Sequence, residues 1–335
     1  MSLRRSHVRG LAGSAARVLG LTAVVACGGT LDAGSNRKEA LPVGPENPVI
    51  VTNDGPSDNW QGEFALLLAR AAGRPLAGLL VSTGGRWYDL DANMAGWQDL
   101  VARARASGIG DVPDPVRSAS APLVKPADGA IDSTTPNDSQ GARFIVETSL
   151  VLGRPERPLV VATGGRLTDV ADAYLLDPGV VERVVVVASL GTGFEGGEKV
   201  AHMGVPNGEM DPWADVIVAQ RFRYVQVSAY YDQRADVPPE RFGELPANAF
   251  GDRMREKQPD ILGTPLAADQ VSVIALGIPD FVLGVTRVSP SSVEAETPTL
   301  VPARNGSAWL VTASDGALAT KRFWELLSDA ATFGG

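Results

Sequence analysis

Short runs of β-branched residues alternate with amphipathic segments along most of this chain, and this alternation limits the folds open to it. The apolar run at 48–52 is followed by 60–72, where apolar residues recur at the three- and four-residue spacing of a helix. Each helix in such a pattern carries the chain back to start the next strand in the same direction. We therefore predict a single α/β domain over residues 48–333, with an open, mostly parallel sheet flanked by helices.

The same alternation predicts the remaining elements. The expected strands are 77–82, 158–163, 183–189, 224–228, 280–288 and 308–312, and the expected helices are 93–107, 142–152, 212–222 and 317–331. Two stretches, 109–141 and 230–264, are rich in proline and polar or charged residues and break the pattern. Loops of this length in a compact domain usually cover or bind something, so we expect lids or binding elements there.

The first residues have the features of an export signal. Arg4, Arg5 and Arg9 precede a weakly apolar stretch at 18–26, which is too short to span a membrane and leads into the sequence Val-Val-Ala-Cys at 24–27. That ending resembles a bacterial lipobox, which predicts a lipoprotein signal peptide over 1–26, lipidation of Cys27 and a flexible tether over 27–47. The protein would then be anchored to a membrane in the cell envelope, outside the cytoplasm. The alternative is a leader that is cut elsewhere, with no role for Cys27.

Composition excludes several classes of function. Acidic residues outnumber basic ones by 39 to 30, so nucleic acid is not expected as a partner. With two histidines and one cysteine, a single chain can form neither a disulfide nor a Cys/His zinc cluster. A GxGxxG pattern at 191–196 is followed by too many glycines for the helix that a dinucleotide site requires.

Acidic residues follow the first predicted strand, where the ligands of parallel sheets bind. Asp54 and Asp58 flank a Gly-Pro turn, and two carboxylates in one tight loop repel each other unless a cation, a proton or substrate hydroxyls compensate them. Oxygen ligands of this kind favour Ca²⁺ or Mg²⁺. The alternative is local structure, with Asp54 in an Asx-turn and Asp58 capping a helix.

Three later segments place polar residues at corresponding positions. Thr163 ends a predicted strand before two glycines, where a backbone carbonyl could bind a metal, or where Thr168 could simply cap a helix. Helix capping explains Asp211, which precedes a proline, but leaves Asn207 unexplained. Capping is also the simplest interpretation of Asp269.

Taken in order, these segments resemble the inosine-uridine nucleoside hydrolase superfamily. Its first strand ends in Asp-x-Asp-Pro-Gly-x-Asp-Asp, and the matching TNDGPSDN at 52–59 retains Asp54 and Asp58 but has Thr52 and Asn59 at the outer positions. The TGGRLT segment at 163–168 is similar to the family's calcium-binding loop, with Arg166 as an extra residue. The spacing from Asn207 to Asp211 resembles the family's Asn-x-x-x-Asp-Pro, and Asp269 follows Ala268 where the family has a His-Asp pair.

The resemblance implies hydrolysis of the N-glycosidic bond of ribonucleosides. Calcium would be held at Asp54, Asn59, the Thr163 carbonyl and Asp269, and Asp54 would deprotonate the attacking water. Asp58 and Asn207 would position the sugar. An alternative is a nucleoside- or sugar-binding surface lipoprotein with impaired catalysis, because a metal-binding carboxylate and a histidine are replaced. Homo-oligomer formation stays open.

The leaving base needs a proton or a stacking partner. With Ala268 in place of the family's histidine, His202 is a candidate acid, although an exposed loop residue is the simpler interpretation. Trp87 and Trp213 are candidates for stacking on the base, with core packing as the alternative. Glu63, one helical turn after Asn59, could restore a metal-binding carboxylate.

Overall fold

In the computed structural model, the chain divides into two units, Met1–Arg37 and Lys38–Gly335, and all described residues belong to the second. The structure describes residues 39–55, 62–63, 66–67, 73, 76–84, 89–194, 198–204, 207–228, 239–257, 271–291 and 297–334. The residues just before the first strand already contact the domain, because Leu41 and Val43 pack against its core and the Asn47 side chain donates to the Pro158 carbonyl.

The described strands form one ten-stranded sheet in the order β3-β2-β1-β4-β5-β7-β10-β8-β9-β6. Their bounds are β1 Val49–Asn53, β2 Leu76–Val81, β3 Pro115–Arg117, β4 Leu159–Gly164, β5 Val184–Ser189, β6 Ala201–His202, β7 Arg223–Val227, β8 Val282–Pro290, β9 Thr299–Pro302 and β10 Ala308–Ser314. Pairing is parallel from β3 to β10 and antiparallel from β10 to β6. The predicted open, mostly parallel sheet is confirmed.

Helices cover both faces of the sheet. The described α-helices are α2 Leu90–Ala106, α3 Gln140–Leu152, α4 Thr168–Leu176, α5 Pro212–Arg221, α6 Ala249–Lys257, α7 Val271–Gly277 and α8 Gly316–Ser328. The described 3-10 helices are η1 Ile131–Ser133, η2 Pro178–Glu182, η3 Gly208–Met210, η5 Pro239–Glu244, η7 Pro279–Phe281 and η8 Ala330–Phe333. Several of the α-helices begin where a side-chain oxygen accepts a hydrogen bond from a backbone N–H of the first turn, as that of Asp89 does for α2 and that of Ser139 does for α3.

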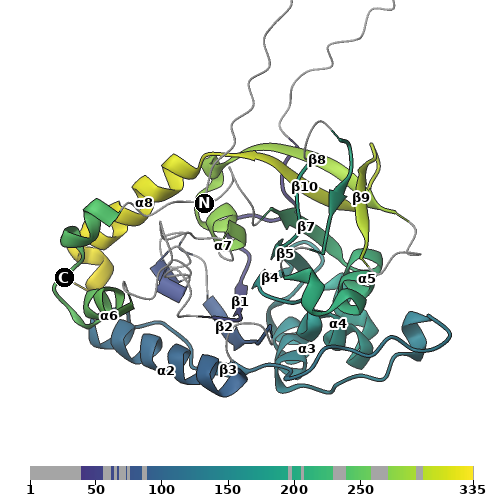
Figure 1. Cartoon of the computed structure of the whole chain (residues 1–335), viewed down its shortest axis with the longest axis horizontal. Coiled ribbons are helices and arrows are strands. Elements are labelled where there is room, and N and C mark those ends of the chain that lie inside the picture. The colour runs from purple at the N-terminus through teal and green to yellow at the C-terminus, as the bar shows by residue number, and fades with distance from the viewer. Residues whose placement is uncertain are drawn as a thin grey trace, which may run out of the picture. The chain divides into compact units, whose positions relative to one another are not determined.

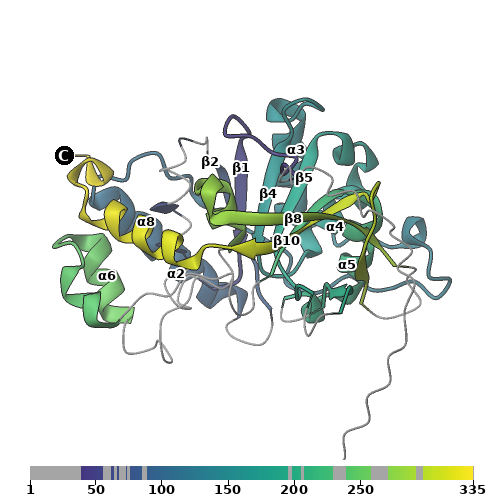
Figure 2. The same cartoon turned by 90° about the horizontal axis from the view of Figure 1, so that it is seen from above.

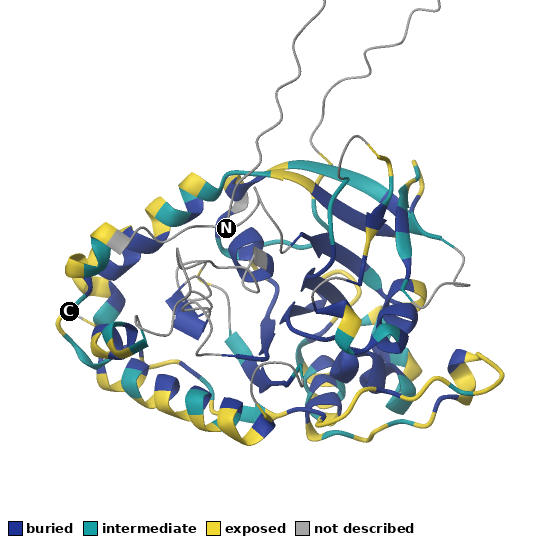
Figure 3. Ribbon diagram, viewed as in Figure 1, coloured by how far each residue is buried: buried dark blue, intermediate teal, exposed yellow. Residues whose placement is uncertain are grey.

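The strands are buried on both sides, and their side chains alternate between two cores. Val49 and Val51 belong to the core beneath α2, α6, α7 and α8, whereas Ile50 belongs to the core beneath α3, α4 and α5. Figure 1 shows these two groups of helices on opposite sides of the central strands. Figure 3 shows the central strands buried, with exposed residues on the outer helix surfaces. Continuous apolar runs such as VVVVAS in β5 follow from this two-sided burial.

The parallel strands bring distant parts of the sequence to one edge. β1 lies between β2 and β4, and Asn53 at its end pairs with both Val81 and Gly164. β4, β5 and β7 run alongside in the same direction. Figure 2 shows β1, β4 and β5 side by side from above. The residues that follow these strands therefore share the carboxyl edge of the sheet, where ligands of open α/β sheets bind.

The two stretches that broke the alternation have different structures. Residues 118–139, which we call the arm, follow β3, contain η1 and lead into α3. The described part of the stretch 230–264 contains η5 and α6, and α6 is a helix that the sequence pattern did not predict. Among the described residues, no helix is both long and apolar enough to cross a membrane.

Candidate functional site

Asp54 follows β1 and lies at the carboxyl edge between the backbones of two glycines. A Cβ atom on Gly165 would lie 3.3 Å from Cγ of Asp54, and one on Gly84 would lie 3.0 Å from its Oδ2. Only 4% of Asp54 is exposed. Because neither glycine carries a side chain, the ends of β2 and β4 can approach the carboxylate closely. The packing therefore fixes this carboxylate in one place.

Helix α2 supports the backbone of Asp54. The buried Asn93 side chain donates through Nδ2 to the carbonyl of Asp54 and, at 3.0 Å, to the carbonyl of Ser82. One amide group thus joins the ends of β1 and β2. Asn93 was not among the predicted site residues, although an Asn on the apolar face of a predicted helix is a signal that points to a buried polar contact.

The segment that carries Asn207 reaches the same edge. Asn207 is buried, and its Nδ2 donates to the carbonyl of Ser189, the last residue of β5, at 2.9 Å. Three residues later, the Met210 sulfur lies so close to Gly84 that an added Cβ would overlap it. Met210 and Asp54 therefore contact the same glycine, and the structure brings the Asn207 segment and Asp54 together.

The start of α7 closes the edge over β4 and β5. The Ser272 hydroxyl donates to the Thr163 carbonyl at 3.1 Å, and the Ser272 backbone N–H donates to Oγ of Ser189 at 2.8 Å. The neighbouring Gly164 carbonyl accepts from Nδ2 of Asn53 at 3.3 Å. The Thr163 carbonyl, predicted above as a metal ligand, and the Gly164 carbonyl thus both lie at this edge and accept hydrogen bonds from side chains.

Acidic residues at the starts of α4 and α5 hold the arm. Asp211 accepts from the Leu123 backbone N–H at 2.9 Å, from the Thr168 hydroxyl at 2.6 Å and, as N-cap of α5, from the Ala214 N–H at 3.0 Å. Asp169 accepts from the Ala119 N–H. Burial raises the pKa of Asp169 and of Asp211 above the usual value for an aspartate.

Thr168 has a different role from the cap considered for it. It is the first residue of α4, and the preceding Leu167 provides no side-chain cap. The Thr168 hydroxyl donates to Asp211 instead, because Asp211 lies at the start of the neighbouring helix. The expectation of a Thr168 cap is therefore wrong.

Arg166 places a positive charge beside this edge. The residue is buried directly after Gly165, and its Nη2 donates to the Ala119 carbonyl at 2.6 Å. Burial lowers the pKa of its guanidinium, while the charges of Asp169, Asp211 and Asp54 raise it. The extra residue of the TGGRLT loop thus adds a cation close to the proposed catalytic carboxylate.

Glu63 has a partner other than the predicted metal. Its Oε1 accepts from Nη1 of Arg253 in α6, and both side chains are buried. The side chain of Arg253 also reaches α2. Glu63, which follows β1, is therefore paired with α6 directly and is linked to α2 through Arg253.

Comparison with solved structures identifies the fold. An inosine-guanosine nucleoside hydrolase superposes with a TM-score of 0.60 at 18% identity, over 84% of this chain and 99% of that one. The chain has the nucleoside hydrolase fold. An inosine-uridine preferring nucleoside hydrolase from Bacillus anthracis gives 0.52 at 15% identity, with 84% and 99% covered. The type III effector protein XopQ, complexed with adenosine diphosphate ribose, gives 0.53 at 14%, with 88% and 95% covered.

Similarity in sequence is much weaker than similarity in fold. No family model matches the chain, and no curated protein matches it in sequence. The comparisons therefore establish the fold, and the site and the roles of its residues have to be argued from this chain.

Several predicted site residues fall outside the described part of the chain. These are Cys27, Asp58, Asn59, Trp87 and Asp269. Their proposed roles in lipidation, sugar binding, metal binding and base stacking stay predictions.

His202 and Trp213 are described, and their surroundings differ. His202 is exposed on the edge strand β6, and its carbonyl accepts from the Thr192 N–H at 2.8 Å. Gly191 adopts a φ of 67° where any side chain would overlap that carbonyl, which explains the first glycine of the GxGxxG pattern. Trp213 is 6% exposed, and its indole N–H donates to the Thr134 hydroxyl at 2.9 Å. Acid catalysis by His202 and stacking by Trp213 stay predictions.

The donor atoms at the edge suit a hard cation. Within the described ranges, no cluster of three or more His, Cys, Asp or Glu side chains could hold a metal ion. The edge nevertheless offers several oxygen atoms, namely those of the Asp54 carboxylate, the Thr163 carbonyl, and the buried hydroxyls of Ser82 and Thr163, which have no hydrogen-bond partner. Oxygen donors of this kind fit Ca²⁺ or Mg²⁺ better than softer metals.

Proposed function

We propose that the protein hydrolyses the N-glycosidic bond of ribonucleosides or of a related N-ribosyl substrate. The observation that carries this proposal is the placement of Asp54, which is fixed between Gly84 and Gly165 at the carboxyl edge, beside the Asn207 segment. The nucleoside hydrolase fold supports it, because two of the similar structures are named as hydrolases of this class.

The chain's own residues have distinct tasks in this reaction. Asp54 takes a proton from water as the new bond forms between the water oxygen and the anomeric carbon. The bond from that carbon to the base nitrogen breaks, and the carboxylates around the sugar stabilise the oxocarbenium-like charge. Asn207 and Asp58 position the ribose, and we assign the proton for the departing base to His202.

Calcium is the proposed cofactor. When bound, it would lower the pKa of a coordinated water and so supply a nucleophile at neutral pH. Asp54, Asn59, the Thr163 carbonyl and Asp269 are the proposed ligands. Because Asn59 is uncharged and Arg166 adds a nearby positive charge, we expect calcium to bind less tightly than to a site with a carboxylate at position 59.

Release of free base tests the proposal. The purified protein is incubated with inosine, uridine and adenosine, with and without calcium, and the products are separated by chromatography. We expect calcium-dependent release of at least one base, with loss of roughly two or more orders of magnitude in Asp54→Asn. Release that is equally fast in Asp54→Asn, with the fold intact by circular dichroism, would contradict the role of Asp54.

A binding protein without catalysis is the second candidate. It is favoured by Asn59 and Ala268, which replace a carboxylate and a histidine of the family pattern. The similar effector XopQ was solved with adenosine diphosphate ribose, which makes that compound a useful probe. Calorimetry with ribose, nucleosides and adenosine diphosphate ribose separates the two candidates, since binding without base release favours the second.

We also propose that the chain is a lipoprotein of the bacterial cell envelope. The supporting observation is the Val-Val-Ala-Cys ending of the apolar segment at 18–26. Expressed from its full sequence in a bacterium, the protein should enter the membrane fraction with a lipid on Cys27, detectable by mass spectrometry. Cys27→Ala should abolish lipidation, and a wild-type product cleaved elsewhere without lipid would contradict the assignment.

A further inference from the structure

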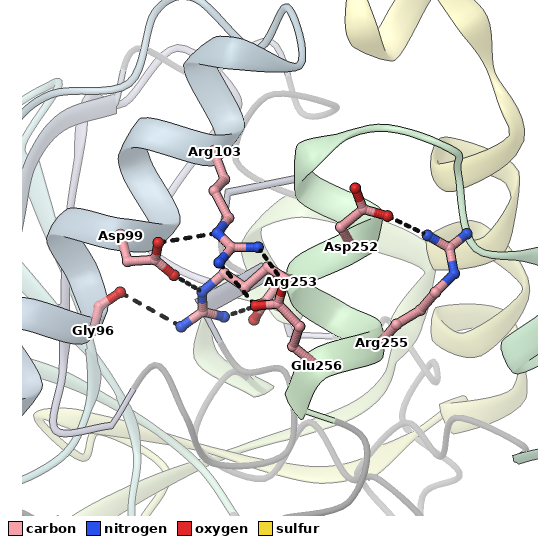
Figure 4. A network of polar contacts seen from close by, with 8 residues as sticks. Gly96, Asp99, Arg103, Asp252, Arg253, Arg255 and Glu256 are labelled. Carbon is pink, nitrogen blue, oxygen red and sulfur yellow. Dashed lines mark hydrogen bonds and ion pairs between the residues drawn. The ribbon is translucent and has the colours of Figure 1, made fainter.

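A buried ion pair joins the chain after β1 to α6. Glu63 exposes 0% and Arg253 1% of its side chain, although 190 residues separate them in sequence. Arg253 also donates from Nε to Oδ2 of Asp99 at 3.1 Å and from Nη2 to the Gly96 carbonyl at 3.4 Å. We call Glu63, Gly96, Asp99 and Arg253 the Arg253 cluster. Figure 4 shows Arg253 reaching from α6 to the labelled Gly96 and Asp99 of α2.

Stability alone is a weak explanation for such a pair. Removing two charges from water costs free energy that their attraction often only balances, so apolar residues of similar size would commonly serve as well. The cost is evident at Glu63, where burial raises the pKa of the carboxyl although the Arg253 charge lowers it. Glu63 Oε2 is buried and has no hydrogen-bond partner. What the pair supplies beyond packing is a fixed geometry.

That geometry is transmitted to Asp54 through α2. Asn93, Gly96 and Asp99 follow one another at three-residue steps in α2, so they occupy successive positions near one face of the helix. Asn93 binds the carbonyls of Asp54 and Ser82, while Gly96 and Asp99 bind Arg253. A single rigid helix therefore contacts both the proposed catalytic aspartate and the ion pair.

The segment from Asp54 to Glu63 is consequently held at both ends. At its start, the Asp54 backbone is bound by Asn93 of α2. At its end, Glu63 is bound by Arg253, which itself binds α2. Two side chains thus fix the ends of this segment on one helix, and Asp58 and Asn59 lie between those ends in sequence.

We infer that Arg253 is a positioning residue of the site, which holds Glu63 against α2 through its bonds to Glu63, Asp99 and Gly96 and so fixes one end of the segment that begins at Asp54. The inference rests on the proposed function for its effect on turnover. It also makes a claim about the segment itself that does not depend on any activity.

Variants of the full chain test the inference. Arg253→Met removes the bonds to Glu63, Asp99 and Gly96, Arg253→Lys retains the charge but loses the fork of donors, and Glu63→Gln weakens the pair from the other side. Arg255→Met is the matched control, because Arg255 lies on the same helix and also binds a carboxylate, that of Asp252 at 2.9 Å, and backbone carbonyls, those of Leu245 and Pro246, none of which belongs to α2. Val288→Ala in β8 provides a core destabilisation on the antiparallel side of the sheet.

Two measurements are made on each variant. Hydrogen exchange followed by mass spectrometry reports the protection of peptides covering 54–63, and steady-state kinetics on the substrate with the fastest base release reports kcat and KM separately. We expect Arg253→Met to raise exchange over 54–63 and to lower kcat roughly tenfold to a hundredfold, since small displacements of reacting groups have effects of that size. Arg253→Lys should recover part of both losses, and Arg255→Met should change neither.

Two results would overturn the inference. One is unchanged exchange over 54–63 in Arg253→Met and Glu63→Gln. The other is a fall in kcat for Arg253→Met that is no larger than the fall for Val288→Ala when the two variants have the same melting temperature. The ion pair would then contribute only to general stability. If the wild type releases no base at all, the proposed function fails, and the exchange data still decide whether Arg253 holds the segment.

Discussion

Gly208 illustrates, at the scale of a single residue, how tightly the Asn207 segment is packed. A Cβ atom at this position would overlap Oδ2 of Asp215 in α5 and the backbone carbonyl of Met203. The carbonyl cannot move aside as a flexible side chain could. The 3-10 turn η3 is therefore confined between α5 on one side and Gly84 with Asp54 on the other.

Gly208→Ala should consequently displace Asn207 from the Ser189 carbonyl. We expect a loss of about 1–3 kcal/mol in the free energy of unfolding and weaker sugar binding, measured by denaturant titration and by calorimetry with ribose or inosine. Gly243→Ala is the control, because no atom lies within 4 Å of its added Cβ. Unchanged affinity in Gly208→Ala would show that η3 does not position the sugar.

Asp215 gives a prediction about pH. Both of its carboxyl oxygens are buried without a hydrogen-bond partner, and burial, with a smaller contribution from the Asp211 charge, raises its pKa well above the ordinary value. A raised pKa in the folded state means that the stability from this group is present at low pH and is lost as pH rises above the ordinary value of 3.8.

Asp215→Asn removes this titration while keeping the shape of the side chain. The free energy of unfolding of the variant relative to the wild type should therefore increase between pH 4 and pH 7, by up to about 1.4 kcal/mol for each pH unit in which only the unfolded state loses the proton. Urea titrations at several pH values measure this difference. A difference that stays constant with pH would mean that Asp215 titrates normally.

At the scale of secondary structure, the helix N-termini explain why acidic residues gather near the site. Asp211 was expected only as a helix cap, yet Asp211 and Asp169 both bind backbone N–H groups of the arm. Asp172, one turn into α4, accepts from the N–H groups of Asp138 and Ser139 at 3.2 and 2.9 Å. The sequence pattern cannot reveal such partners, because they come from residues more than thirty positions away.

Asp172→Asn should loosen the arm where it joins α3. One acceptor oxygen is replaced by a donor, so a backbone N–H of Asp138 or Ser139 loses its partner, at a cost of about 1–3 kcal/mol. Hydrogen exchange over peptides covering 131–141 should rise. Asp177→Asn, at the end of α4 and bonded to Gly179 and Arg183, is the matched control. Equal protection in both variants would contradict the anchoring role.

The elements recovered from sequence are those with strong local patterns. The central strands β1, β2, β4, β5 and β7 lie within two residues of their predicted bounds, because burial on both faces produces continuous apolar runs. The strands β3, β6 and β9 were missed. They are short, lie on the edge or antiparallel side of the sheet, and depend on partners that a local pattern does not contain. Helix α6 was missed because its stretch is rich in charge.

At the scale of the whole molecule, the site exists because a parallel sheet gathers residues that are far apart in sequence. Asp54, Ser82, Thr163 and Ser189 follow or end four different strands and meet α2, η3 and α7 at one edge. The order of strand-end motifs predicted this edge. The supporting contacts from Arg166 and Arg253 could not be predicted, because they depend on how the arm and the helices pack around this edge.

Calcium should stabilise the whole domain if it binds this edge. A ligand that binds only the folded state at a hundred times its Kd adds about 2.7 kcal/mol to the free energy of unfolding. Thermal unfolding of the wild type should therefore shift upward with calcium, and Asp54→Asn should lose most of the shift. A wild-type melting temperature that is indifferent to millimolar calcium would exclude a site of useful affinity.

The most direct test of the account is a crystal structure of the protein with calcium and a non-hydrolysable nucleoside analogue. The account predicts one ion bound by the carboxylates of Asp54 and Asp269 and by the Thr163 carbonyl, with Asn207 against the sugar. Carboxylates of Asp54 and Asp269 that face separate regions, with no ion or sugar between them, would contradict it.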